Sequence, residues 1–293
     1  MSHFFLGSAW MEVMRKAGHI HRSIAIHTTP DPIWLGESAL LKGKYWHLYG
    51  TPEPNTENDL RQILYQAKRQ KAITVQCRYN MARWVDREML ERNGCQIIEP
   101  FGTWVIDLTQ DLQTLWNQLH PHHRRLVRKA MRLPDLEMRP LERLQDLVPM
   151  LESTYQRGGK SNPFSMPYLE AVQSMEDPRL IRRGVYFQDR LIAGLVVPYD
   201  AQRGYFLHGG IADDAPGGIS AWMHWQIFAL LRELSIPEYD LGGARPDSPD
   251  PRLRGISLFK ERFGGTFKPC WYFESCFRPW TRKVHSMVLS WGQ

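Results

Sequence analysis

The hydrophobic and polar positions of the first hundred residues alternate between a helical period and a strand period. Apolar residues spaced three to four positions apart predict helices, and short apolar runs bounded by turn residues predict strands. Helices are predicted at 10–16, 56–70 and 85–93, apolar segments at 23–26 and 45–49, and strands at 72–76 and 96–98. This alternation predicts an α/β fold.

A similar order of elements begins again after residue 100. Helices are predicted at 112–131, 144–156, 167–174 and 220–234, and strands at 103–108, 136–139, 180–187, 191–199 and 203–208. At 293 residues a single hydrophobic core would be stretched. We therefore expect a first domain at 1–99, a second at 100–275, and a final segment, 276–293, that packs on the first domain.

The net charge of the chain indicates which kinds of molecule it is expected to bind. The formal net charge is +6 and the isoelectric point is about 9.2, so the chain should attract polyanions such as nucleic acid, phosphorylated small molecules or an anionic membrane. A solvated basic surface is the alternative interpretation. The sequence shows neither a signal peptide nor an apolar run long enough to span a membrane. We expect a cytoplasmic protein that can touch the inner face of the membrane.

Cysteine and histidine positions do not favour a metal site. The four cysteines form no CxxC pair and no zinc-finger spacing. His120, His122 and His123 cluster at a helix start without a distant acidic or cysteine partner, which indicates solvated surface more than metal binding. We expect no metal.

Two glycine-ended runs near the C-terminus carry the strongest functional signal. Tyr239-Asp240-Leu241-Gly242-Gly243 predicts a strand ending in paired glycines, which let the backbone bend or approach a ligand. The second run, Phe259-Lys260-Glu261-Arg262-Phe263-Gly264-Gly265, places two cations between aromatic residues. Together they predict a place to hold an anionic substrate.

Two further features could hold an anion. Arg125 and Arg128 belong to a basic helical face, which is either an electrostatic dock for phosphates or solvated surface. Gly217 and Gly218 precede a helix whose free N–H groups and dipole can face a phosphate or an oxyanion. The basic helix lacks the interleaved aromatics needed to stack bases, so we do not expect sequence-specific nucleic-acid binding.

The order of these features resembles the FemABX family of peptidoglycan interpeptide-bridge transferases. The resemblance spans nearly the whole chain and rests on residues 104–108, 124–130, 155–157, 222–234, 239–243 and 259–265. The run from Tyr239 to Gly243 followed by Phe-Lys and Phe-Gly-Gly is its most specific part. The resemblance implies two GNAT-like domains, each a mixed, mainly antiparallel sheet flanked by helices. No sustained heptad insertion is present, so the chain is similar to family members without a coiled-coil arm.

The resemblance also implies the reaction and its participants. The donor would be an aminoacyl-tRNA, and the acceptor an amine on the stem peptide of a UDP-linked or lipid-linked muramyl peptide precursor. Neither a metal nor a redox cofactor is needed, and we expect a monomer. Lys260 is the expected catalytic residue.

The remaining site residues follow from the same resemblance and from the glycine and cationic motifs. Gly217, Gly218, Arg125 and Arg128 are expected to bind the donor. Residues expected to bind the acceptor are Arg157, Tyr205, Phe259, Arg262, Gly242 and Gly243.

Two other functions stay open at the level of sequence. A GNAT-like N-acyltransferase would use acyl-CoA on an amine of a glycan or metabolite. However, residues 213–218 do not match the Arg-x-x-Gly-x-Gly/Ala loop by which GNAT enzymes hold the CoA pyrophosphate. An inactive phosphoglycan-binding module would use Lys260 and Arg157 only as anion contacts.

Overall fold

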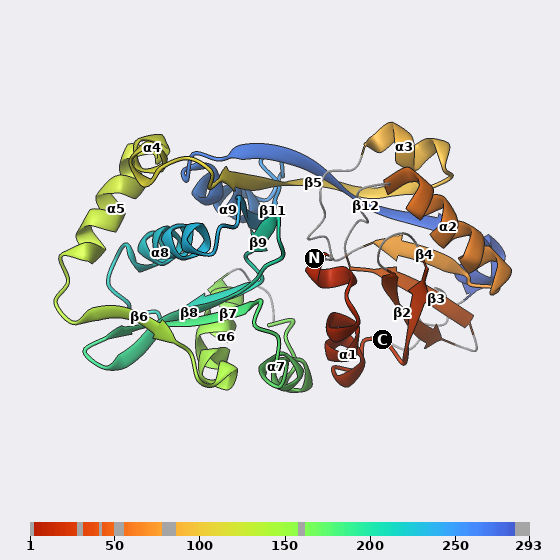
Figure 1. Cartoon of the computed structure of the whole chain (residues 1–293), viewed down its shortest axis with the longest axis horizontal. Coiled ribbons are helices and arrows are strands. Elements are labelled where there is room, and N and C mark those ends of the chain that lie inside the picture. The colour runs from red at the N-terminus through yellow and green to blue at the C-terminus, as the bar shows by residue number, and fades with distance from the viewer. Residues whose placement is uncertain are drawn as a thin grey trace. The chain divides into compact units, whose positions relative to one another are not determined.

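The structure, a computed structural model, contains two compact units. It describes residues 3–27, 32–40, 43–49, 56–77, 86–157 and 162–284. Gly102–Lys268 forms one unit, and the described residues of Ser2–Phe101 and Pro269–Gln293 form the other. Strands β5 (Gln96–Asp107) and β12 (Thr266–Cys276) contribute residues to both (Figure 1).

The unit that begins the chain is built on a sheet with the order β1-β2-β3-β4-β12. Neighbouring strands are antiparallel except β3 and β4, which are parallel. Its core joins Leu60 and Ile63 of helix α2 to Trp46 and Val75 of the sheet. Its elements are η1 (Phe4–Leu6), α1 (Ser8–Lys16), β1 (Arg22–Ile26), β2 (Ile33–Leu40), β3 (Gly43–Leu48), α2 (Thr56–Arg69), β4 (Thr74–Cys77) and α3 (Arg87–Arg92).

The unit Gly102–Lys268 holds a second sheet, β10-β8-β7-β6, whose strands are all antiparallel. Beside it, β11 pairs antiparallel with β5 and parallel with β9. Its further elements are α4 (Leu112–Gln118), α5 (Pro121–Met131), β6 (Leu136–Pro140), η2 (Leu144–Leu147), α6 (Val148–Arg157), α7 (Met166–Gln173), β7 (Leu180–Phe187), β8 (Arg190–Pro198), β9 (Arg203–Tyr205), β10 (His208–Ile211), α8 (Ile219–Glu233), β11 (Glu238–Ala244) and α9 (Pro251–Glu261).

Helix α8 is the centre of this unit. Figure 1 shows it on one side of the four-stranded sheet, with α6 and α7 on the other side. Its buried residues Phe228 and Leu231 share one core with Leu195 of β8 and Ile106 of β5. At 15 residues it is the longest helix in the described part of the chain, which therefore contains no long helical arm.

Three predicted elements of this unit are confirmed. Helix α8 corresponds to the segment predicted at 220–234. Strands β7 and β8 correspond to those predicted at 180–187 and 191–199, and they pair as an antiparallel hairpin. The hairpin turns at Gln188 and Asp189, whose φ angles of 52° and 59° suit the tight turn that joins twisted strands.

The prediction of one continuous helix at 112–131 is wrong. The chain forms α4 and α5 instead, and the two residues between them, Leu119 and His120, have extended ψ angles of 134° and 142°. Pro121 is the cause, because its ring excludes the residue before it from the helical conformation, while proline itself fits the first turn of a helix. The side chain of His120 caps the new helix by accepting a hydrogen bond from the N–H of His122 at 3.2 Å.

The prediction that a strand ends before Pro100 is also wrong. Strand β5 runs from Gln96 to Asp107 without interruption. Its pairing with β11 covers only Gly102 to Asp107, so Pro100, which has no N–H to donate, lies outside that ladder.

The segment predicted as one strand at 203–208 divides into two. Residues of β9 pair with β11, and the N–H of Phe206 still donates to the carbonyl oxygen of Asp240 at 2.8 Å. Leu207 then donates to Val196 of β8, and β10 continues in the other sheet. The chain therefore leaves β11 at this point, and an opening forms between β10 and the end of β11.

Two features are absent from the described residues, a membrane-spanning helix and a metal-binding group. None of their helices combines the length and the hydropathy needed to cross a membrane. Nor do three or more of their His, Cys, Asp and Glu side chains gather as a metal site. In the histidine cluster, the interpretation as solvated surface is wrong for His123, which is buried with Nε2 2.9 Å from the carbonyl oxygen of Phe259.

Candidate active site

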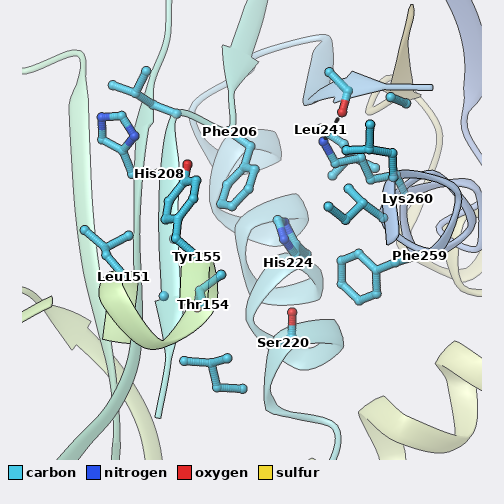
Figure 2. Close-up of a pocket in the computed structure, with 18 of the residues that line it drawn as sticks. Leu151, Thr154, Tyr155, Phe206, His208, Ser220, His224, Leu241, Phe259 and Lys260 are labelled. Atoms are coloured by element: carbon cyan, nitrogen blue, oxygen red, sulfur yellow. Dashed lines mark hydrogen bonds between the residues drawn. The ribbon is translucent and has the colours of Figure 1, made fainter. Parts of the chain in front are cut away.

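A cavity of about 450 Å³ lies in the opening between β10 and β11. Its walls come from α6, β10, the first turns of α8, the end of β11 and α9, so it lies entirely within Gly102–Lys268. Lys260 marks one end and Tyr155 the other, with Phe206 and His224 between them (Figure 2). A mostly apolar hollow with a few converging polar groups is the usual form of a small-molecule site.

The end of β11 bends in a bulge beside this cavity. Its pairing with β5 shifts register between Asp240 and Gly243, which leaves β11 with an extra residue. Gly242 has a φ of 78°, a conformation that glycine adopts without steric strain. The carbonyl oxygen of Gly243 accepts a 2.7 Å hydrogen bond from Nζ of Lys260. The two glycine-ended runs of the sequence therefore meet at this bulge.

Asp240 holds the bulge in place. Its side chain is buried, and Oδ1 accepts hydrogen bonds from the N–H of Gly242 at 2.7 Å and from the hydroxyl of Thr103. Nη1 of Arg203 lies 3.7 Å from Oδ2. Burial raises the pKa of Asp240, and these three partners act against that shift. Both carboxyl oxygens are engaged, so Asp240 supports the backbone and leaves the cavity to other groups.

Lys260 extends from α9 to the bulge and lines the cavity. Burial lowers the pKa of its ammonium group to about 8; nearby Arg245 lowers it further, while Asp240 acts in the opposite sense. The amine is therefore mainly charged at pH 7 but titrates well below an ordinary lysine. Such a cation can bind a phosphate or stabilise an oxyanion.

His224 places an uncharged polar group between the two ends of the cavity. Its Nδ1 lies 3.0 Å from the hydroxyl of Tyr239, and both side chains are buried. Burial lowers the pKa of His224 to about 3, and the positive charge of Lys260 adds to this effect. The imidazole is neutral at physiological pH.

The end of the cavity opposite Lys260 is aromatic. The ring of Phe164 lies 4.0 Å from that of His208 and 5.7 Å from that of Tyr155, measured between centroids. Nε2 of His208 lies 2.5 Å from the hydroxyl of Tyr168, and burial lowers the pKa of His208 to about 3, so its ring is also neutral. This end suits an uncharged, apolar part of a substrate.

Three residues that the sequence predicts for the site line the cavity, namely Lys260, Phe259 and Gly243. Gly242 adjoins them, since a Cβ added there would lie 3.5 Å from Nζ of Lys260. Tyr205 is fully buried beneath the cavity wall, where its hydroxyl donates to Oδ2 of Asp200 at 3.0 Å.

Arg262 is a predicted substrate-binding residue that does not line this cavity. Arg262 lines a separate hollow of about 540 Å³ together with His120 and Arg124. Arg157 is the last residue of α6, and its side chain lies outside the described residues.

The predicted donor-binding glycines lie where α8 begins. Gly218 caps α8 with a φ of 106°, and a Cβ there would lie 2.4 Å from the carbonyl oxygen of Leu126, so α5 and α8 are in close contact. A Cβ on Gly217 would lie 3.3 Å from Nζ of Lys129. This lysine brings a cation to the positive end of the α8 dipole.

The two predicted donor-binding arginines lie on α5. Arg125 contacts Nδ1 of His122 at 3.3 Å, and the guanidinium of Arg128 lies 5.2 Å from the ring centroid of Trp116. Neither is among the described residues that line the cavity.

Sequence reasoning missed His224, Phe206 and Arg245, all of which line the cavity. One signal was available for His224, because it is the only titratable residue in the apolar helix segment 219–231. Phe206 and Arg245 carried no comparable signal, since only the separation of β10 from β11 exposes them to a ligand.

Comparison with known proteins identifies this architecture. Residues 120–250 match the family model described as an acetyltransferase (GNAT) domain. The crystal structure of FemX superimposes with a TM-score of 0.76 at 13% sequence identity, covering 97% of this chain and 94% of FemX. The chain has the FemX fold. The predicted α/β fold of GNAT-like domains is thereby confirmed.

Two other structures superimpose on this chain with lower TM-scores than FemX. L-PGS from Bacillus licheniformis gives a TM-score of 0.60 at 11% identity, with 97% of this chain and 96% of that chain covered. The C-terminal domain of a putative lysylphosphatidylglycerol synthetase from Agrobacterium fabrum gives 0.58 at 13% identity, with 91% and 87% covered. No curated protein sequence matches the chain. The GNAT match includes β10, α8 and β11 of the cavity wall, which supports an acyltransferase, and it ends before α9 and Lys260.

Proposed function

We propose that the protein is a FemX-like aminoacyltransferase, which moves an amino acid from aminoacyl-tRNA to an amine of a muramyl peptide precursor. The observation that carries the proposal is the position of Lys260 in a GNAT-type cavity within a FemX fold. Its ammonium group faces the space where a substrate would bind, at the bulge formed by the glycine pair.

The reaction is aminolysis of an ester and needs neither a metal nor a redox cofactor. The neutral acceptor amine attacks the carbonyl carbon, a C–N bond forms, and the carbonyl oxygen becomes negative. The C–O bond to the tRNA ribose then breaks, and the proton lost by the amine ends on the ribose hydroxyl. Lys260 can stabilise negative charge on the oxyanion or on a phosphate of the precursor.

The charges around the cavity support an anionic acceptor. Arg245 and Arg252 line it together with Lys260, and these three cations outweigh the carboxylate of Asp250, which lies 3.2 Å from Arg252. UDP-linked and lipid-linked muramyl peptides both carry phosphates that these cations can bind. We propose that the protein works as a monomer in the cytoplasm and touches the membrane's inner face when the precursor is lipid-linked.

Acyl-CoA is the second candidate donor, favoured by the match of residues 120–250 to a GNAT acetyltransferase domain. The start of α8, with Gly218 as its cap and Lys129 beside Gly217, offers positive potential to either the CoA pyrophosphate or a tRNA phosphate. The name of the lysylphosphatidylglycerol synthetase neighbour adds phosphatidylglycerol as a further acceptor.

One assay separates these functions. The protein is incubated with UDP-linked muramyl pentapeptide or phosphatidylglycerol, together with either charged tRNA or acyl-CoA, and the mass of the acceptor is followed. A gain of one aminoacyl residue on the muramyl peptide, only with charged tRNA, supports the proposal. Transfer from acyl-CoA alone refutes the aminoacyl donor, and precursor binding without transfer indicates an inactive binding module.

The basic face of α5 should affect affinity for the donor more than turnover. Reversing the charges of Arg125 and Arg128 to glutamate should weaken donor binding and flatten its dependence on salt, because each lost phosphate contact lowers the salt slope by about one. The measurement is the dissociation constant at several salt concentrations. An unchanged slope would assign α5 to solvated surface.

The pKa of Lys260 predicts the pH dependence of acceptor binding. Below pH 8 the ammonium is charged and attracts phosphate, and this charge is lost as pH rises through about 8. The affinity of the wild-type protein for UDP-linked muramyl peptide should therefore fall between pH 7 and 9, whereas Lys260→Arg should not show this fall, because arginine stays charged. The same pH dependence in both proteins would exclude Lys260 as the titrating group.

A further inference from the structure

His224 and Tyr239 form a buried hydrogen-bonded pair that the action of Lys260 does not require. His224 lies in the second turn of α8 and lines the cavity, where Figure 2 shows its ring between Phe206 and Phe259. Tyr239 reaches it from β11, with its hydroxyl 3.0 Å from Nδ1. The exposed fractions are 3% for His224 and 0% for Tyr239, so water does not compete for this bond.

The direction of this hydrogen bond follows from the inventory of donors. The Tyr239 hydroxyl is protonated, because burial and the nearby charge of Asp240 raise its pKa. Among the described residues, Nδ1 of His224 is the hydrogen-bond partner of that hydroxyl. If His224 donated instead, the tyrosine hydrogen would be buried without an acceptor, which is costly. Tyr239 therefore donates to Nδ1, and the imidazole proton resides on Nε2.

The ring nitrogen that carries the proton is directed away from Tyr239. Nε2 makes no hydrogen bond within the described residues. It is nevertheless not one of the fully buried side-chain nitrogens without a partner, so its surface is partly accessible. Because His224 lines the cavity, its Nε2–H is available to a ligand there. Lys260 and His123 are the titratable groups that disfavour a second proton on the ring, so this N–H belongs to a neutral imidazole.

We propose that Nε2–H of His224 donates a hydrogen bond to the carbonyl oxygen of the acyl group undergoing transfer, and that Tyr239 is a positioning residue that holds the required tautomer. The inference rests on the proposed acyl transfer. It makes His224 a second group, besides Lys260, that stabilises the carbonyl oxygen. As the acceptor amine adds to the carbonyl carbon, the oxygen gains negative charge and this hydrogen bond strengthens. His224 keeps its proton throughout, and the proton of the amine goes to the leaving oxygen.

The first experiment needs no turnover. Nitrogen-15 NMR of protein labelled at histidine distinguishes protonated from unprotonated ring nitrogens. We expect His224 of the wild-type protein to carry its proton on Nε2 at pH 7, and Tyr239→Phe to populate both tautomers. A wild-type protein with the proton on Nδ1 would overturn the inference and leave the proposed function standing.

The second experiment measures kinetics of the acyl transfer with the donor that proves active. His224→Leu should lower kcat by about a hundredfold with KM nearly unchanged, the loss typical of removing one oxyanion donor. His224→Gln retains an N–H near the position of Nε2, so its kcat should be at least about tenfold higher than that of His224→Leu. The glutamine variant also tests the role of His224 if the leucine variant fails to fold. Equal kcat in wild type and folded His224→Leu would refute the role of His224.

A matched control separates positioning from loss of a buried tyrosine hydroxyl. Tyr168 also bonds a buried histidine, His208, at 2.5 Å. Tyr168→Phe and Tyr239→Phe should lower thermal stability to a similar extent, but only Tyr239→Phe should disturb the tautomer of His224. An undisturbed tautomer of His224 in Tyr239→Phe would reduce Tyr239 to a structural role. If the wild-type protein transferred no acyl group from either charged tRNA or acyl-CoA, the proposed function would be refuted. The proposal that His224 binds the carbonyl oxygen would then be refuted as well.

Discussion

Replacing Lys260 by alanine should lower kcat/KM by more than about tenfold, equivalent to roughly 1.4 kcal/mol of transition-state stabilisation. The variant loses the ammonium that donates to Gly243 at 2.7 Å and faces the cavity. The measurement is the rate of transfer to the acceptor under identical donor concentrations.

Folding should be retained in this variant, because Lys260 is only partly buried and its backbone stays within α9. Thermal unfolding of Lys260→Ala checks this point. Lys68→Ala provides a matched control, since Lys68 is an exposed lysine in the last turn of α2 and lies outside the cavity. Its activity should stay within about twofold of wild type. Unchanged turnover in Lys260→Ala would remove Lys260 from the mechanism.

The local features of the fold could be predicted from sequence where a single segment contains the deciding signal. Helix α8 follows a glycine pair and stops before Pro237, and the β7–β8 hairpin has its turn residues in place. The break between α4 and α5 is also encoded locally, because Pro121 disfavours the helical conformation at the residue before it.

The separation of β9 from β10 could not be predicted in the same way. Residues 203–205 and 208–211 both form strands, and which neighbour each strand pairs with depends on β8 and β11. The cavity exists because of this change of partner. Sequence pattern therefore indicates the strand but not the opening beside it.

In the candidate site, too, the sequence predicts features encoded within one segment but not those that depend on contacts between distant segments. The paired glycines and the Phe-Lys pair predict a positively charged site for an anionic ligand. The structure brings Gly243 and Lys260, which are 17 positions apart in the sequence, into contact. The orientation of His224 depends on Tyr239 in a different element, so periodicity along the helix does not indicate it.

Substituting alanine at Gly264 should lower the free energy of unfolding by about 3 kcal/mol. Gly264 follows the end of α9, has a φ of 82°, and donates its N–H to the carbonyl oxygen of Glu261 at 2.9 Å. A side chain in this left-handed conformation costs about 1–2 kcal/mol. An added Cβ would also lie 2.4 Å from the carbonyl oxygen of Gln118, a backbone atom that cannot move alone, and such overpacking costs about 1–3 kcal/mol.

Gly242→Ala is the matched control for that contact. Gly242 lies in the same unit with a nearly equal φ of 78°, but the nearest atoms to its added Cβ are the carbonyl oxygen of Phe206 at 3.4 Å and Nζ of Lys260 at 3.5 Å. These are ordinary contacts, so only the backbone strain remains and the expected loss is about 1 kcal/mol. Urea unfolding followed by tryptophan fluorescence measures both variants. Equal losses would mean that α4 moves away from the added methyl group at no cost in free energy. A larger loss in Gly264→Ala would mean that Gly264 is needed because the chain after α9 packs closely against α4.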